Sequence, residues 1–474
     1  MNITEPLRAL AGGRPDTVAV VRPRGGKVTL REFERQVDHI ARRCLAVGVG
    51  PGTLVLVAVR RPLRLLQIEL ALARIGAAAM SPSVDRTLAE VRFIEGDAKP
   101  NPPPGRHYID AWFDEPAGEG PPVAMHDDPA ATAIVCPSSG TTGTPKAIPI
   151  GHAQLAARIA AANQGVPLPA APRQVCVPTA ASGFGIVTLL RVLYAGGTLV
   201  AAATPAEIIA AVERFHVNRI TMSPIWVEQL VSALPATGNP LAALEEIELG
   251  GASLPPSLYR LARERLCERL YSIYGSTESG FIATGLLDGL DLERGEVGRV
   301  LPALEVEAFD ADGRQLPRGS EGILRMRGPV CVDRYLGAPE ASAETFRDGW
   351  VALPDLGRIT EDGTLSVVGR ANDVINVGGY KVNPTDIEKT LLSLDFIADA
   401  AAFGVPDPNG IVRLCAAIVL RAPVDRATLD ARLRERMSHQ QPSLVLQVKS
   451  IPRNEGGKIL RQQLVALASG ARVH

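Results

Sequence analysis

The chain has 474 residues, of which 46% are hydrophobic and 21% are charged, a composition typical of a globular protein with a substantial core. At roughly 100–200 residues per domain, this length predicts about two to four domains. Fifty basic residues stand against 51 acidic ones, giving a net charge of −1. This balance argues against a nucleic-acid binder with a broad basic surface and against a polybasic membrane anchor.

Cysteine usage and hydropathy indicate in which cellular compartment the protein is expected. The six cysteines occur singly, without a C-x-x-C pair, which indicates neither a disulfide framework nor a zinc cluster. Residues 1–16 contain no apolar run of the kind found in secretory signals. The longest apolar region, residues 185–203, is interrupted by Arg191 and by Gly196-Gly197, so we expect a buried helix and strand there rather than a membrane span. We therefore expect a cytoplasmic protein.

Helix and strand patterns alternate in the first part of the chain. Residues 29–32, Thr-Leu-Arg-Glu, form a capping-box sequence, and apolar residues then recur at spacings of three and four as far as Cys44, which predicts a helix. Residues 54–59 are a short apolar run that predicts a buried strand. Thr204 and Pro205 predict the start of a helix through Phe215, followed by a strand over residues 218–222. This alternation predicts an α/β fold with helices packed on sheets.

The pattern changes in the last third of the chain. Residues 295–370 contain short strand patterns separated by turns, which predicts a β-rich subdomain. Beyond residue 369 the pattern predicts a small α+β unit, with helices near residues 384–394 and 425–437 and strands near residues 398–403 and 415–420.

The clearest chemical signal is the segment over residues 136–147, Cys-Pro-Ser-Ser-Gly-Thr-Thr-Gly-Thr-Pro-Lys-Ala. It follows an apolar run and is therefore expected to be a loop that leaves a strand. Glycines let backbone N–H groups approach an anion, hydroxyls donate to phosphate oxygens, and a lysine adds charge. The loop is not a Walker A motif, because Pro145 precedes the lysine and Ala147 follows it. The candidate phosphate-binding residues are Ser138, Ser139, Gly140, Thr141, Thr142, Gly143 and Lys146.

This segment resembles the phosphate loop of the adenylate-forming superfamily, which includes acyl- and aryl-CoA synthetases, nonribosomal adenylation domains and luciferases. Further motifs follow in the family's order, so the resemblance spans nearly the whole chain and is greatest to an acyl- or aryl-CoA ligase. It implies a large N-terminal adenylation domain, a short hinge and a small mobile α+β C-terminal domain. The implied boundaries are 1–369, 370–373 and 374–474.

Residues 271–279, Tyr-Ser-Ile-Tyr-Gly-Ser-Thr-Glu-Ser, resemble the family's Y-G-x-T-E motif. The resemblance implies that Tyr274 stacks on adenine beside Gly275, that the Thr277 hydroxyl contacts the α-phosphate, and that Glu278 helps to hold Mg²⁺. A carboxylate suits this hard cation, which takes few protein ligands when phosphates supply the others.

Two more motifs are similar to the family's nucleotide contacts. Asp355 stands where the family usually has the aspartate of T-G-D, and a carboxylate can accept both ribose hydroxyls. Arg370 corresponds to an arginine that contacts the nucleotide, and Asn372 stands at the hinge, where the family more often has Asp or Lys. The small residues beside adenine and the acyl pocket correspond to Gly250, Gly251 and Ala252.

The C-terminal part resembles the family at two further places. Residues 377–388 are similar to the loop that enters the site for the second half-reaction, where Gly378 and Gly379 would let a pantetheine arm pass. Residues 452–461 are similar to the C-terminal P-x-x-x-x-G-K-[IL]-x-R pattern, which aligns Lys458 with the catalytic lysine. Its ammonium can offset negative charge at the substrate carboxylate and α-phosphate. His152 we expect to have a structural role at a helix start.

The resemblance implies a two-step reaction that uses ATP, Mg²⁺ and CoA. A carboxylate attacks the α-phosphate to give an acyl-adenylate and pyrophosphate, and a thiol then displaces AMP. Ala180 stands where domains for α-amino acids commonly have an aspartate, and a buried ammonium without a partner is costly, so an α-amino acid is disfavoured. Small residues beside Phe184 favour an aryl or medium acyl group.

Several alternatives remain open. A freestanding adenylation enzyme that loads a carrier protein or acylates an amine would share every motif, although we expect no fused carrier-protein domain, which favours free CoA. An inactive nucleotide-binding module is disfavoured by the joint presence of the five charged residues assigned to the site. Luciferase-type oxidation is a remote alternative. The expected partners are a small carboxylic acid, ATP and CoA, with neither nucleic acid nor a membrane span.

Overall fold

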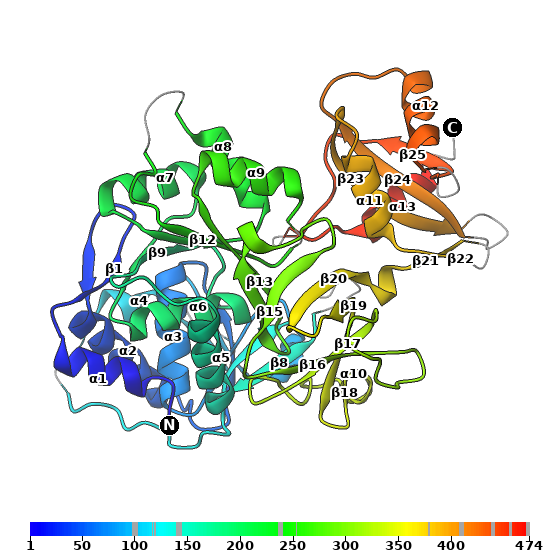
Figure 1. Cartoon of the computed structure of the whole chain (residues 1–474). Coiled ribbons are helices and arrows are strands. Elements are labelled where there is room, and N and C mark those ends of the chain that lie inside the picture. Colours follow the sequence, from blue (N-terminus) through cyan, green and yellow to red (C-terminus); the bar gives the residue numbers. More distant parts are fainter. Residues whose placement is uncertain are drawn as a thin grey trace. The chain divides into compact units, whose positions relative to one another are not determined.

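The computed structural model describes residues 1–96, 103–115, 117, 120–138, 145–235, 240–252, 254–377, 380–406, 412–437, 441–454 and 457–470. The contacts within the chain divide it into two compact units (Figure 1). The first unit comprises Met1–Val306, Arg325–Ala352 and Asp362–Leu365. The second unit comprises Glu307–Leu324, Leu353–Glu361 and Ser366–His474.

The first unit contains a six-stranded sheet with the strand order β6-β5-β3-β4-β7-β8. All neighbours are parallel except β7 and β8, which form an antiparallel pair. Parallel neighbours need a crossover connection, which α3 supplies between β3 and β4. The strands are β3 (Leu54–Ala58), β4 (Ala78–Met80), β5 (Val91–Ile94), β6 (Arg106–Tyr108), β7 (Thr132–Pro137) and β8 (Ala147–Gly151).

A second sheet of the first unit has the order β15-β14-β13-β12-β11-β9-β10-β1-β2. The strands from β13 to β1 are parallel, whereas β2, β14 and β15 add antiparallel pairs. The strands are β1 (Val18–Val21), β2 (Lys27–Thr29), β9 (Arg173–Cys176), β10 (Thr198–Val200), β11 (Arg219–Met222), β12 (Glu246–Gly250), β13 (Arg269–Ser276), β14 (Gly280–Leu286) and β15 (Glu296–Val300).

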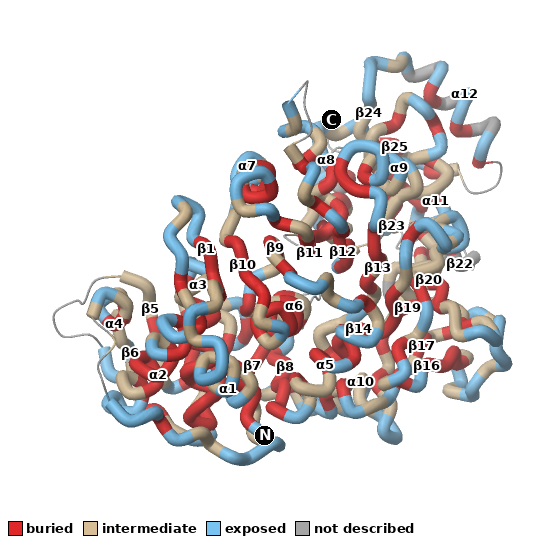
Figure 2. Tube along the Cα trace, turned by 60° about the vertical axis from the view of Figure 1, so that its left-hand side comes forward, coloured by how far each residue is buried: buried red, intermediate tan, exposed pale blue. Residues whose placement is uncertain are grey.

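Helices cover both sheets and bury their apolar faces against them, as Figure 2 shows by the buried positions along β9 to β13 and α6. The helices are α1 (Glu5–Gly13), α2 (Leu30–Ala46), α3 (Pro62–Arg74), α4 (Asp110–Asp114), α5 (His152–Gly165), α6 (Gly183–Tyr194), α7 (Pro205–Phe215), α8 (Ile225–Ala233), α9 (Pro256–Arg265) and α10 (Pro339–Thr345). Short 3₁₀ turns occupy Arg86–Leu88 and Leu287–Gly289.

Local capping signals determine where two of these helices begin. Thr29 Oγ1 accepts from Glu32 N at 3.2 Å and Glu32 Oε2 accepts from Thr29 N at 2.7 Å, which confirms the predicted capping box of α2. Thr204 caps α7 in the same way by accepting from Glu207 N. The apolar region 185–203 forms α6 and β10, as expected. Within the described residues, no helix is long and apolar enough to cross a membrane.

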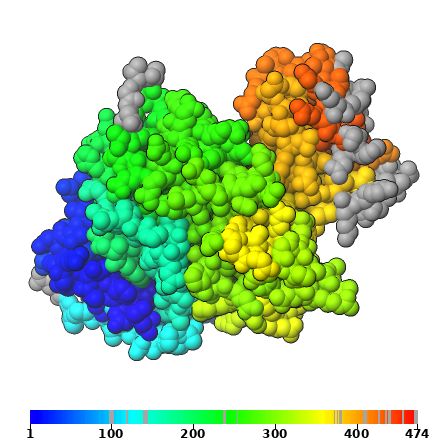
Figure 3. Space-filling model, in the orientation of Figure 1, coloured from blue at the N-terminus to red at the C-terminus, as the bar shows by residue number. Residues whose placement is uncertain are grey.

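The N-terminal segment is anchored on the first unit by two side chains. His152 Nδ1 accepts from Ile3 N at 3.1 Å, and the Tyr194 hydroxyl donates to Ile3 O. Figure 3 shows the blue N-terminal segment against the teal region that contains α5 and α6. His152 is fully buried at the first position of α5, and this place supports the structural role expected for it.

The second unit contains a three-stranded sheet, with the order β23-β24-β25, and helices on both faces. Apolar side chains of α11 and α12 pack on one face, and those of α13 pack on the other. The elements β23 (Ile397–Pro406), β24 (Val412–Leu420), α11 (Pro384–Leu392) and α12 (Arg426–Met437) confirm the predicted α+β pattern. The remaining elements are β21 (Ile375–Val377), β22 (Tyr380–Val382), β25 (Leu444–Gln447) and α13 (Arg461–Gly470).

Short strands fill the region predicted to be β-rich. Strands β16, β17, β19 and β20 are neighbours in that order. Strand β18 pairs with the start of β19 through Phe346 and Val351. These strands are β16 (Glu305–Phe309), β17 (Gly322–Arg327), β18 (Phe346–Arg347), β19 (Trp350–Ile359) and β20 (Thr364–Arg370), and a 3₁₀ turn follows at Ala371–Asp373.

Candidate active site

The carboxyl ends of neighbouring parallel strands bring several predicted residues to one edge of the larger sheet. Strands β9, β11, β12 and β13 are adjacent and parallel, so the residues that follow them lie along the same edge (Figure 1). Ligands of open α/β sheets bind at this edge. Gly250 ends β12 opposite Ile273 of β13, and Tyr274 is the next residue of β13. Gly251 and Ala252 follow directly after β12.

Close packing at Gly250 accounts for the absence of a side chain there. A Cβ at this position would lie 3.0 Å from Ile273 O and 3.1 Å from Phe184 Cζ, closer than side chains normally approach. Phe184, near the start of α6, forms an edge-to-face contact with Phe281 at a centroid distance of 5.5 Å. The predicted small-residue stretch therefore lies beside a pair of aromatic rings.

Thr277 and Glu278 lie in the turn between β13 and β14, and β13 ends with the half-buried Tyr274, the exposed Gly275 and Ser276. Glu278 is buried, and its Oε1 accepts a hydrogen bond from the Tyr335 hydroxyl at 2.9 Å. Burial raises the pKa of Tyr335, and the charge of Glu278 adds to this effect, so the hydroxyl keeps its proton at neutral pH. Among the described residues, the second Glu278 oxygen accepts no hydrogen bond, and this carboxylate fits the Mg²⁺ ligand expected of it.

Tyr335 also brings Lys146 to this turn. The Lys146 ammonium lies 4.7 Å from the centroid of the Tyr335 ring, a cation–π distance. The ring and the hydroxyl of Tyr335 thus contact two predicted site residues, Lys146 and Glu278, that are far apart in the sequence. Tyr335 itself was not predicted, because it is an isolated aromatic residue between strands and its hydrogen-bond partner is 57 positions away. No local pattern in the sequence indicates such a contact.

The base of the predicted phosphate loop is closed by two hydrogen bonds. Lys146 N donates to Ser138 Oγ at 2.9 Å, and Ser138 N donates to Lys146 O at 2.9 Å. These bonds extend the β7–β8 pairing by one position, and β7 confirms that the loop leaves a strand. Seven of the predicted residues lie outside the described part of the chain, namely Ser139, Gly140, Thr141, Thr142, Gly143, Gly378 and Gly379.

In the second unit, the predicted ribose and nucleotide residues contact each other. The buried Asp355 of β19 forms an ion pair with Arg370 at the end of β20, with an Nε–Oδ1 distance of 3.0 Å. Asn383 caps α11 and also donates to Val368 O at 2.8 Å, so the strand that ends at Arg370 is tied to α11. Asn372 belongs to the 3₁₀ turn that follows Arg370.

Lys458 lies at one end of a tight turn in the second unit. Lys458 N donates to Asn454 Oδ1 at 2.9 Å, and Asn454 N donates to Lys458 O at 2.9 Å. The bridge between Arg453 and Ile459 continues this pairing, so the backbone of the half-buried lysine is well defined. Arg461 forms ion pairs with Glu388 and Asp373, which supports the structural role expected for it.

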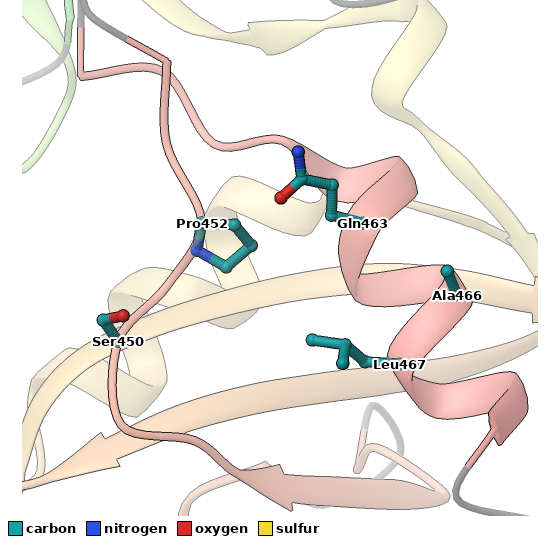
Figure 4. Close-up of a pocket in the computed structure, with 5 residues that line it drawn as sticks. All are labelled: Ser450, Pro452, Gln463, Ala466 and Leu467. Atoms are coloured by element: carbon teal, nitrogen blue, oxygen red, sulfur yellow. The ribbon is translucent and has the colours of Figure 1, made fainter.

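An open hollow beside α13 contains none of the candidate residues (Figure 4). Its lining has no ionisable side chain and consists of Ser450, Pro452, Gln463, Ala466 and Leu467. Within the described residues, no group of three or more His, Cys, Asp and Glu side chains could hold a metal ion. Mg²⁺ takes few protein ligands when phosphates supply the others, and Glu278 stays the residue predicted to hold it.

An adenylate-forming enzyme is the class of protein that combines these features. They are the parallel sheet, the predicted phosphate loop after β7, the Thr277-Glu278 turn and the small C-terminal α+β domain. The chain belongs to the AMP-binding enzyme family, which it matches over residues 7–102 and 104–336. Residues 386–458 match the C-terminal domain of AMP-binding enzymes.

Individual relatives cover different shares of the chain. It is 33% identical to 4-coumarate–CoA ligase-like 6 from Oryza sativa subsp. japonica over 74% of this chain, and this alignment covers 64% of the rice protein. It is 30% identical to the salicyl-AMP ligase / salicyl-S-ArCP synthetase of Mycobacterium tuberculosis over 95% of this chain and 88% of that protein.

A solved structure extends the likeness to the whole fold. The amide bond synthetase McbA from Marinactinospora thermotolerans is 27% identical, with a TM-score of 0.83 over 98% of this chain and 99% of that one. The predicted fold class, an α/β protein with a large N-terminal and a small C-terminal domain, is therefore confirmed.

Proposed function

We propose that the protein activates an aryl or medium-chain carboxylic acid with ATP and then transfers the acyl group to CoA. One observation supports this most strongly: Tyr335 joins Lys146 of the phosphate loop to Glu278 of the Thr-Glu turn. These two charges suit the two parts of a magnesium nucleotide, because an ammonium binds phosphate oxygens and a carboxylate binds Mg²⁺.

In the first half-reaction, a substrate carboxylate oxygen attacks the α-phosphorus of ATP. The bond from this phosphorus to the oxygen that bridges to the β-phosphate breaks, and pyrophosphate leaves with the electron pair. The Thr277 hydroxyl donates to the α-phosphate, and the Lys146 and Lys458 ammoniums offset the negative charge that builds there. Bound Mg²⁺ neutralises phosphate charge, and Glu278 would hold it.

The other assigned residues bind and orient the nucleotide. Tyr274 follows Ile273, the partner of Gly250 in β13, and its ring is assigned to stacking on adenine. The Asp355 carboxylate can accept both ribose hydroxyls, and its ion pair with Arg370 keeps it in one orientation. In the second half-reaction a thiolate attacks the acyl carbon and AMP leaves with the electron pair of the broken C–O bond. Gly378 and Gly379 are assigned to the passage of the thiol.

The surroundings of α6 support an uncharged acyl group, and in particular an aryl one. The Phe184 ring lies beside the bare backbone of Gly250 and packs edge-to-face on the buried Phe281. Ala180 is buried and offers no charge to an ammonium. The names of two relatives, 4-coumarate–CoA ligase-like 6 and salicyl-AMP ligase, refer to aryl acids.

A second candidate function is transfer of the acyl group to a carrier protein or an amine. The likeness to an amide bond synthetase over nearly the whole chain favours an amine, and the name salicyl-S-ArCP synthetase favours a protein-bound thiol. Both acceptors would use the same first half-reaction. They differ from CoA only in the group that attacks the acyl-adenylate.

Pyrophosphate release tests both candidates. The protein would be supplied with MgATP and a panel of aryl, short-chain and medium-chain carboxylates, each with and without CoA. Multiple turnovers that require CoA and are fastest with aryl acids would support the ligase. Release that stalls near one turnover with CoA and resumes with an amine or a carrier protein would support the second candidate. Nucleotide binding without any release would show an inactive module.

A further inference from the structure

Arg158 is a buried arginine of α5 whose hydrogen bonds within the described residues all go to backbone carbonyls. Its Nε donates to Val330 O at 2.8 Å, its Nη1 to Thr277 O at 3.0 Å and its Nη2 to Glu278 O at 3.0 Å. The side chain is 2% exposed, and within the described residues it forms no ion pair with a carboxylate. A buried guanidinium without such a partner is unusual, because taking the charge out of water is costly.

The three carbonyls belong to the two segments that form the Thr-Glu site. Thr277 and Glu278 supply the predicted α-phosphate and Mg²⁺ contacts, and Val330 lies five residues before Tyr335, which holds the Glu278 carboxylate. Glu278 O also accepts from Val332 N at 2.9 Å. Arg158 therefore joins the turn after β13 to the segment that carries Tyr335.

One glycine leaves room for the Arg158 side chain, and a second lies within van der Waals distance of it. Gly280 has a φ of +67°, and a Cβ there would lie 3.0–3.3 Å from the Arg158 side chain. A Cβ at Gly183, the first residue of α6, would lie 3.7 Å from Arg158 Nη1 and 3.4 Å from Thr277 Cγ2. The turn and the start of α6 thus pack closely around the arginine.

Arg158 keeps its positive charge under these conditions. Burial lowers the pKa of Arg158 to about 10, while nearby Cys136, Cys331 and Glu278 act in the opposite direction. The group is therefore protonated at neutral pH. A fixed positive charge behind the backbone of Thr277 and Glu278 favours an anion at the site of those two residues.

We propose that Arg158 is a positioning residue for adenylation, which holds the Thr277–Glu278 backbone so that the hydroxyl and carboxylate meet the nucleotide and Mg²⁺. This inference rests on the proposed function. The planar fork of arginine can bond all three carbonyls at once, whereas lysine supplies the charge without the fork. Substitution can therefore separate the contribution of the positive charge from that of the three hydrogen bonds.

The test compares Arg158→Met and Arg158→Lys with Arg74→Lys, a change at another fully buried arginine. Arg74 pairs with Glu34 and Asp38, away from the Thr-Glu turn. Arg158→Met should lower kcat for pyrophosphate release about 100-fold, raise the Mg²⁺ concentration for half-maximal rate about tenfold, and leave KM for the acid nearly unchanged. Arg158→Lys should recover part of kcat, and Arg74→Lys should lower Tm only.

Wild-type kcat and Mg²⁺ dependence in a folded Arg158→Met protein would overturn the inference, as would an equal loss of kcat in Arg74→Lys. If Arg158→Met does not fold, Arg158→Lys decides by the same two readouts. If the wild-type protein releases no pyrophosphate with any acid, the proposed function fails separately. Calorimetric measurement of MgATP binding then decides. Binding that is weaker than wild type in the Arg158 variants but not in Arg74→Lys supports the inference, and equal binding in all of these proteins contradicts it.

Discussion

Among the described residues, the Tyr335 hydroxyl is the group that hydrogen-bonds to the Glu278 carboxylate. Tyr335→Phe removes this hydrogen bond to a charged acceptor, worth about 1.5–3 kcal/mol, but keeps the ring beneath Lys146. We expect kcat for adenylation to fall about tenfold, the Mg²⁺ requirement to rise, and Tm to fall by a few degrees at most. Pyrophosphate release titrated with Mg²⁺ would measure this. An unchanged Mg²⁺ titration would show that the hydroxyl does not position Glu278.

His152 connects stability to pH. Burial lowers the pKa of His152 to about 4, and His126 and the N-terminal amine act in the same direction, so the unfolded chain binds more protons between about pH 6.5 and 4. The stabilising contribution of the neutral ring is complete above pH 6.5 and is lost as the pH falls toward 4, by up to about 3 kcal/mol. Denaturant unfolding of wild type and His152→Gln at pH 7 and pH 5 would measure it. The variant should lose less stability on acidification, and an equal loss in both proteins would contradict the assignment.

At the scale of residues, sequence motifs predicted those site residues whose type is required by their proposed chemistry. Lys146 was predicted from the glycine- and hydroxyl-rich loop that precedes it. Thr277 and Glu278 were assigned through the resemblance of residues 271–279 to the family's motif, and a hydroxyl and a carboxylate suit phosphate and Mg²⁺. Tyr335 and Arg158 were not predicted, because their roles depend on contacts with residues 57 and 119 positions away. Such contacts arise from tertiary packing, and they leave no periodic or local pattern in the sequence.

At the scale of elements, the sequence predicts where helices begin better than it predicts which strands pair. The starts of α2 and α7 were predicted, because capping hydrogen bonds join residues three positions apart. The strand order was not predicted. Neighbours such as β1 and β10 pair across about 180 residues, so nothing local to either strand specifies the partner. The edge that gathers the site residues follows from this order.

A buried ion network joins α6 to the sheet beneath the site. Glu248 of β12 pairs with Arg191 of α6 at 2.9 Å and with Arg219 of β11, and Thr221 donates to it at 2.6 Å. Burial alone would raise the pKa of Glu248, but the two arginines together lower it, so it is ionised. On the same face of β12, Gly250 lies against Phe184 of α6. The network therefore fixes α6 where it borders the proposed acyl pocket.

Glu248→Gln would leave two buried guanidiniums with only part of their compensating charge. We expect the free energy of unfolding to fall by about 3–5 kcal/mol, as measured by urea unfolding. The exposed pair Arg299–Asp362 provides a control, since Asp362→Asn should cost less than about 1 kcal/mol. A loss at Glu248 no greater than that at Asp362 would show that the network does not hold α6 in place.

At the scale of the whole molecule, the roles predicted for the two domains came from the resemblance to the adenylate-forming superfamily. The pattern of the last hundred residues indicated a small α+β unit, which the structure contains. Nothing in composition or charge marks residues 370–373 as a hinge, so that boundary depends on the family motifs and stays a prediction. Of the residues predicted to bind the nucleotide, Asp355, Arg370 and Lys458 belong to the second unit.

Lys458→Ala tests whether one lysine of the second unit serves only the first half-reaction. The ammonium is assigned to charge that builds at the α-phosphate, and thiol attack on a finished acyl-adenylate does not generate that charge. We expect adenylation to slow by about 100- to 1000-fold, while thioester formation from supplied acyl-adenylate and CoA stays within about threefold of wild type. Both rates would be measured in single turnovers. Lys449→Ala, which changes an exposed lysine of the same unit, should alter neither rate. Equal loss of both half-reactions in Lys458→Ala would exclude a domain movement that removes this lysine before the thiol arrives, because the lysine would then be needed throughout.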